Sequence, residues 1–87
     1  MKVFVFIKTH QFDYGSSGAQ VRVFNTFEKA KRHFEEKRKQ AIIDFEALGK
    51  KSEQNNYSEG DMEWSIWEKD EYLYNHIDLA IVEREVE

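Results

Sequence analysis

The chain has 87 residues, a formal net charge of −4 and no cysteine, so it allows one domain with one modest core and excludes disulfides and thiolate chemistry. No apolar run approaches the roughly 18 residues of a membrane-spanning helix, and the apolar run after Lys2 is too short for a signal peptide. We therefore expect a single soluble domain over residues 1–87, located in the cytoplasm and without membrane contact.

The first predicted strand covers residues 2–9 and is apolar on both faces. Aliphatic and aromatic side chains alternate along it, in the order Val3, Phe4, Val5, Phe6 and Ile7. Apolar residues on both faces are typical of a central strand, or of one whose second face is also covered. A polar connection over residues 10–20 leads to a second strand at about 20–24, which indicates a wide hairpin.

A single amphipathic helix is predicted from Asn25 to Gly49. Asn25 or Thr26 can cap its first turn, and Glu28 is placed to close a capping box on Asn25. Gly49 is a typical residue just past a helix end. The apolar residues recur at helical spacing and form one stripe, made of Phe27, Ala30, Phe34, Ala41, Phe45 and Leu48. Charged residues occupy the other faces, so we expect the stripe to contact a sheet.

Two further strands are predicted after the helix. Residues 50–61 are polar, and we expect a mobile loop there. The third strand is predicted over 62–68 and the last over 76–86, while a short extended piece at 72–74 would make a fifth strand. The order β-β-α-β-β predicts an α+β fold, with one long amphipathic helix packed across a mostly antiparallel sheet of four to five strands.

The predicted helix is longer than the predicted strands. At 1.5 Å per residue it spans about 35 Å, whereas a strand of seven residues spans about 23 Å. We therefore expect the C-terminal end of the helix to extend beyond the sheet and to expose apolar side chains, namely Ile42, Ile43, Phe45 and Leu48. Either the 50–61 loop or a second chain must cover them, and we favour a second chain.

The aromatic content is higher than one helix face can cover, with seven phenylalanines, four tyrosines and two tryptophans. We expect the surplus to line the sheet face away from the helix and to form a binding or self-association surface. With the helix end included, the predicted partner-binding residues are Phe4, Phe6, Phe24, Trp64, Trp67, Tyr72, Tyr74, Ile42 and Phe45. The alternative is a strongly curled sheet that buries these rings within one chain.

Charge is distributed unevenly along the chain. From Glu59 to the end there are ten acids against two bases, whereas bases outnumber acids along the helix. Opposite charges can face one another across the fold, or the acidic C-terminal half can engage a basic partner, such as a nucleic-acid-handling enzyme that it inhibits. The alternative function is a nucleic-acid-binding module that uses the basic helix residues 29–39. An isoelectric point near 5.4, with cations spread around the helix, argues against nucleic acid as a partner.

Candidates for catalysis or metal binding are weak. His10 with Asp13 matches no nucleophile motif, and His33 lies among charged helix residues. His76 and Asp78 lie two residues apart on one strand face, but a third metal ligand is not identifiable. We therefore predict no catalytic residue, no metal site and no cofactor, and we do not expect an enzyme.

The stretch from Val23 to Ala30, which ends a strand and opens the helix, follows an opening strand and precedes a tryptophan-bearing strand and a closing strand. In this pattern the chain resembles a loose group of small uncharacterised bacterial and phage or mobile-element proteins. The shared motifs are structural, so the resemblance implies an accessory role and no particular active site. We predict a small intracellular protein that acts by protein–protein contact as a homodimer.

Overall fold

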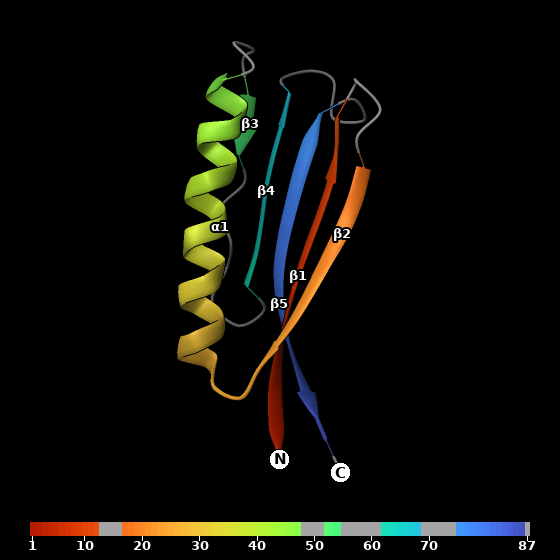
Figure 1. The fold of residues 1–87 in the computed structure, drawn as a ribbon, viewed down its shortest axis with the longest axis vertical. Helices are drawn as coiled ribbons and strands as arrows, with labels where there is room; N and C mark the ends of the chain where they lie inside the picture. The colour runs from red at the N-terminus through yellow and green to blue at the C-terminus, as the bar shows by residue number, and fades with distance from the viewer. Residues whose placement is uncertain (13–16, 48–51, 55–61, 69–74, 87) are drawn as a thin grey trace.

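The computed structural model describes residues 1–12, 17–47, 52–54, 62–68 and 75–86, and the structural statements below concern these residues. It contains the elements β1 (Lys2–Gln11), β2 (Ser17–Phe24), α1 (Phe27–Ala47), β3 (Ser52–Gln54), β4 (Met62–Glu68) and β5 (His76–Glu85). The strands form one sheet in the order β2-β1-β5-β4-β3, and every neighbouring pair is antiparallel. Helix α1 packs across one face of this sheet (Figure 1). The predicted α+β fold is confirmed.

The first and last strands lie side by side at the centre of the sheet. All ten residues of β1 pair with β5, from Lys2 opposite Glu85 to Gln11 opposite His76. Both chain ends therefore lie at the same end of the molecule (Figure 1). This pairing also determines which side chains of the two strands share a face, because directly opposed residues point to the same side of a sheet.

The core lies between α1 and the sheet. On the helix the buried residues are Ala30, Phe34, Ala41 and Phe45, which belong to the predicted apolar stripe. On the sheet they are Phe6, Trp64, Ile66, Ile77, Leu79 and Ile81. Phe6 lies edge-on to Phe34, with ring centroids 6.4 Å apart. Burying one such side chain contributes about 1.5–3 kcal/mol, so these residues are the main source of stability.

Helix α1 begins after Thr26, which is its N-cap. The backbone N–H of Lys29 donates a hydrogen bond to Thr26 Oγ1 over 3.3 Å, and the N–H of Ala30 donates to the Thr26 carbonyl oxygen over 3.3 Å. The third helical position is thus Lys29 rather than Glu28. Since a capping box needs a glutamate or glutamine at that position, the predicted box on Asn25 does not match this helix start. The lysine ammonium of Lys29 instead donates to Asn25 Oδ1 over 3.3 Å.

The predicted overhang of the helix is wrong for the residues described. Strands β1 and β5 have ten residues each and span about 33 Å, which matches the 21-residue helix at about 31 Å. Phe45 is accordingly buried beneath Phe12, with ring centroids 6.1 Å apart, and Ile42 packs against the core. Ile43 is exposed, and Leu48 lies outside the described residues.

The remaining differences concern the segments after the helix. The three-residue strand β3 lies within the segment predicted as the 50–61 loop and pairs with β4 at the sheet edge. The rest of that segment, and the proposed strand at 72–74, lie outside the described residues. In the part of the chain that the structure describes, no helix combines the length and the apolar character needed to cross a bilayer.

Candidate functional site: the open face of the sheet

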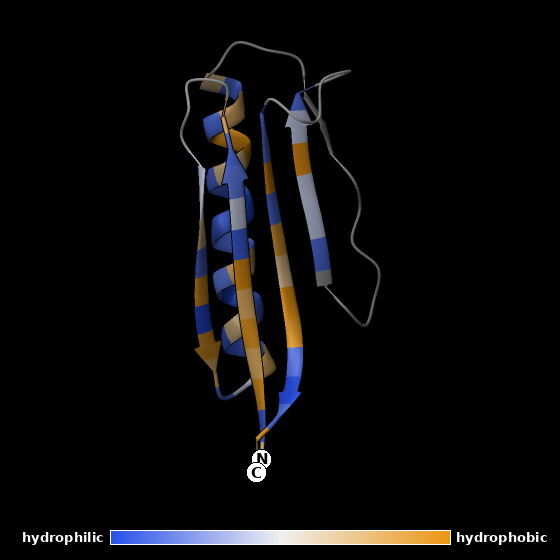
Figure 2. Cartoon of the chain, turned by 90° about the vertical axis from the view of Figure 1, so that its right-hand side faces the viewer, coloured by the Kyte–Doolittle hydropathy of each residue, from blue (hydrophilic) through white to orange (hydrophobic). Residues whose placement is uncertain are grey.

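The sheet has one face that α1 does not cover, which we call the open face. In β1 the even positions point to the helix, because Phe4 contacts Phe27 and Phe6 contacts His33 and Phe34. The odd positions of β1 therefore point to the open face. Figure 2 shows the sheet with α1 behind it.

Strand register assigns the other open-face residues row by row. Val5 pairs with Val23 of β2 and Val82 of β5. Ile7 likewise pairs with Val21 and Ala80. With Val3 at the end of β1, these residues form an aliphatic patch: Val3, Val5, Ile7, Val21, Val23, Ala80 and Val82.

The aliphatic patch is accessible to solvent. Val21 and Val23 are 61% and 62% exposed, and the other members are half-buried by their neighbours in the sheet. These aliphatic side chains form one contiguous apolar area across three adjacent strands. Contiguous apolar areas on a protein surface commonly mark contact sites. The patch is therefore the first candidate for an interaction surface.

A polar cluster adjoins the aliphatic patch on the same face. Asp78 of β5 lies between Thr9 of β1 and Ser65 of β4 in the register. The Ser65 hydroxyl and Asp78 Oδ1 are 2.6 Å apart, and His76 Nδ1 and Asp78 Oδ2 are 2.8 Å apart. A depression of about 250 Å³ lies over this row, lined by Ile7, Thr9, Glu63, Ser65, Asp78, Leu79 and Ala80.

This polar cluster includes the pair that the sequence marked as a candidate metal site. His76 and Asp78 do contact each other, but no group of three or more His, Cys, Asp or Glu side chains that could hold a metal occurs among the described residues. In a Ser-His-Asp triad the histidine lies between the hydroxyl and the carboxylate. Here the carboxylate of Asp78 lies between Ser65 and His76, so the order of the three groups differs from that of a triad.

The predicted aromatic binding face is not where the structure places those rings. Phe6 and Trp64 are buried against the helix, at 0% and 2% exposure. Phe4 and Phe24 pack against the same core from its edge. The expectation that Phe4, Phe6 and Phe24 line the face away from the helix is wrong, since the strand pairing directs them inward; one of the two tryptophans was expected on that face, and Trp67 lies there.

The other predicted partner-binding residues have different locations. Phe45 is buried and Ile42 is partly buried in the core beneath α1. Trp67 lies on the open face, opposite His76 in the register of β4 and β5. Tyr72 and Tyr74 lie outside the described residues. Only Trp67 among the described members of this set lies on the open face, and the residues that dominate this face are aliphatic.

A second feature is the basic seam, where the edge strand β2 meets α1. It comprises two adjoining hollows that share His33. One hollow is lined by Gln20, Val21, Arg22, His33 and Lys37, and the other by Phe24, Lys29, Arg32, His33 and Glu36. Local sequence patterns do not join these residues, because Gln20, Val21, Arg22 and Phe24 lie on β2 and the others lie on α1.

His33 occupies the centre of the basic seam. Its ring lies edge-on to Phe6 at 4.6 Å and tilted against Phe24 at 5.4 Å. Burial lowers the pKa of His33 below its usual value of 6.5, and the nearby charges of Arg22 and Lys37 lower it further. Its Nε2 atom is buried without a hydrogen-bond partner. The ring is therefore packed into the edge of the core, although the neighbours of His33 along the helix are charged.

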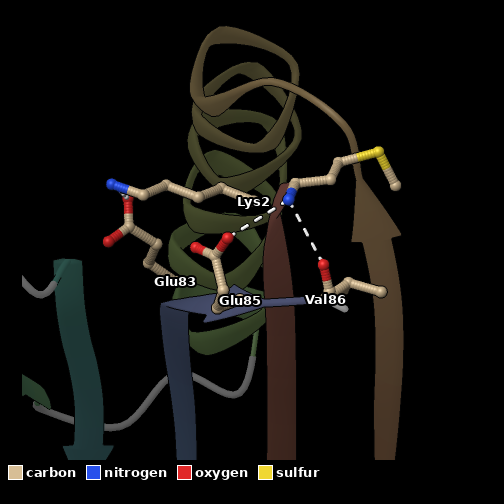
Figure 3. Close-up of polar contacts among 5 residues, drawn as sticks. Lys2, Glu83, Glu85 and Val86 are labelled. Carbon is tan, nitrogen blue, oxygen red and sulfur yellow. Dashed lines mark hydrogen bonds and ion pairs between the residues drawn. The ribbon is translucent and has the colours of Figure 1, made fainter.

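Opposite charges meet where the two chain ends lie together. The N-terminal ammonium contacts Glu85 Oε1 at 3.1 Å and donates to the Val86 carbonyl oxygen at 3.2 Å, and Lys2 Nζ lies 3.8 Å from Glu83 Oε1 (Figure 3). These groups are well exposed, so the pairs add little stability. They show that part of the acidic C-terminal strand is paired with basic groups of the same chain, as the first of the two charge interpretations expects.

Comparison with protein-family models, with curated proteins and with solved structures finds no match for this chain. The resemblance to small bacterial and phage or mobile-element proteins therefore stays a prediction.

Proposed function

We propose that this chain is a protein–protein interaction module that forms a homodimer through the open face of its sheet. The observation that carries the proposal is the aliphatic patch, whose valines on β2 are more than half exposed. Covering such a patch with a second sheet removes apolar area from water at about 25 cal/mol per Å², which supplies a driving force for association. The proposed setting is the cytoplasm, as expected from the sequence.

The charges that flank the patch favour a second copy as the occupant. On β5 the open face carries Asp78, Ala80, Val82 and Arg84 in succession. A two-fold axis that crosses β5 near residue 81 places the two copies of this series over one another in opposite directions. It brings Arg84 over Asp78 of the partner subunit and Val82 over the partner's Ala80. The face is thus complementary to itself, as an isologous interface requires.

Stacked sheets in proteins lie about 10 Å apart with interdigitating aliphatic side chains, and the open face has the small and branched side chains that this packing uses. The edge strand β2 offers a different mode of association, by strand addition. Gln20 and Arg22 alternate with its valines on the opposite side, and charged or polar edge residues disfavour such pairing. Face-to-face stacking is therefore the mode we propose.

The test is molar mass by light scattering over a range of protein concentrations. We expect a dimer for the wild-type chain and a monomer for Val5→Arg/Val82→Arg, because the four introduced charges of the dimer would meet at its centre. A matched control is Ile43→Arg, since Ile43 is 57% exposed on the outer side of α1. A wild-type monomer at every concentration would contradict the proposal, as would a dimer that survives the double substitution.

A further inference from the structure

The basic seam carries more positive charge than the chain neutralises. Lys29, His33 and Lys37 are spaced four residues apart, so they lie along one side of α1. Arg22 faces them from β2, since it pairs with Phe6 and thus points to the helix side of the sheet. Its guanidinium lies 5.6 Å from the centre of the Phe24 ring. The seam therefore gathers cations from two elements around one histidine.

These cations are not balanced by acids of the seam. Glu36 is the acid among the residues that line the two hollows. Within the described part of the chain, Arg22, Arg32 and Lys37 have no ion-pair partner. The buried Nε2 atom of His33 also has no partner. Arg22 and Lys37 lie beside His33 and disfavour its protonation. The positive field of the seam therefore comes from these cations and does not need a charged imidazole.

The outer face of the same helix is different. A hollow there is lined by three acids and three bases, namely Glu28, Lys31, Arg32, Glu35, Glu36 and Lys39. The acids and bases around it are equal in number, so its net field is weak. The comparison shows that an excess of positive charge is a property of the seam and not of the helix as a whole.

We propose that the basic seam binds phosphate groups, one in each of its two hollows. The hollows measure about 380 and 320 Å³ and are open to solvent, which suits phosphate groups that remain partly hydrated. Arg22 can present its planar donors to two oxygens of one phosphate while Lys37 supplies a point charge. Lys29 and Arg32 play the same part in the second hollow. Two adjoining sites fit successive phosphates of a nucleic-acid backbone or of a small polyphosphate.

The cations of this site lie on the helix side of β2, and the site shares only Val21 with the aliphatic patch of the proposed dimer interface. The ligand chemistry is shared by two sources, so the experiment uses two probes. The first is a fluorescently labelled single-stranded oligothymidylate, measured by anisotropy at low and moderate salt. The second is tripolyphosphate, measured by calorimetry. Binding of the oligothymidylate alone identifies a nucleic-acid backbone as the source, and binding of tripolyphosphate alone identifies a small polyphosphate.

The test variant is Arg22→Glu/Lys37→Glu, and the matched control is Lys31→Glu/Lys39→Glu, which makes the same change in net charge on the outer face. We expect the test variant to weaken binding of the responsive probe by about tenfold or more at low salt, and the control to weaken it by about twofold or less. Phosphate should also raise the pKa of His33 in the wild type, followed by NMR of its ring protons. Equal losses in both variants, or no binding of either probe, would overturn the proposal.

Discussion

Replacing Phe6 by alanine tests which face of the sheet the helix covers. Phe6 is completely buried, lies edge-on to His33 and Phe34, and opposes Ile81 in the sheet. Truncating a phenylalanine in such a place costs about 3–5 kcal/mol, through lost burial and the cavity that remains. A domain of 87 residues has a total stability of about 4–13 kcal/mol. Phe6→Ala should therefore lose at least about a quarter of the free energy of unfolding.

The assay is equilibrium unfolding in urea, followed by circular dichroism at fixed protein concentration. Ile43→Ala is the control, because Ile43 is 57% exposed and alanine is the better helix former. We expect its free energy of unfolding to change by no more than about 0.5 kcal/mol. If Phe6→Ala lost less than about 1 kcal/mol, the placement of the even positions of β1 beneath the helix would be refuted.

Substitutions at three further positions test local features. Asn75 is buried, and its Nδ2 donates to Glu68 Oε2 over 2.6 Å, so Asn75→Ala should cost about 1–3 kcal/mol in urea unfolding. Asn75→Asp should lower the free energy of unfolding further at neutral pH, because its carboxylate then meets that of Glu68. Part of that loss should disappear on acidification, and equal losses at both pH values would contradict the contact. The folded-state pKa of His33 lies below 6.5, so the unfolded chain binds more protons between these two values. The free energy of unfolding should therefore fall as the pH drops through 6.5 toward the folded-state pKa, and His33→Phe should reduce that slope; an unchanged slope would refute the assignment. Thr26→Ala should cost about 1 kcal/mol through loss of the N-cap, and Thr26→Ser should cost less; a loss shared equally by Asn25→Ala would place the cap at Asn25 instead.

The local pattern of the sequence predicted the helix and the four longer strands of the fold. The helical spacing of the apolar stripe predicted the correct element, and Ala30, Phe34 and Ala41 of that stripe are buried against the sheet, whereas Phe45 was expected on an overhanging helix end. The helix begins at Phe27 because Thr26 caps it, one of the two alternatives left open. Strand β3 was missed because a three-residue polar strand at a sheet edge has no periodicity to detect.

The orientation of β1 could not be read from its own residues. Both of its faces are apolar, so alternation separates Phe4 and Phe6 from Val5 without showing which set meets the helix. The pairing with β5 decides this, because Phe6 opposes Ile81 and both then lie on the buried face. Long-range strand pairing is absent from local sequence patterns, and for that reason the aromatic residues were predicted on the wrong face.

The basic seam was within partial reach of the sequence. Lys29, His33 and Lys37 are four residues apart, a spacing that places them on one side of any helix. The contribution of Arg22 depends on the fold, since it comes from the neighbouring edge strand. The helix cations are divided between the seam and the outer face, as the sequence predicted, and it is Arg22 from β2 that adds positive charge to the seam.

The most direct test of the central claim is the search for NOEs between subunits in a mixture of isotope-labelled and unlabelled protein. If the open face is the dimer interface, methyl groups of Val5, Val23 and Val82 should show NOEs to methyl groups of the other subunit, and Ile43 should show none. Absence of intersubunit NOEs at these valines, together with the tumbling time of a monomer at millimolar concentration, would contradict the account.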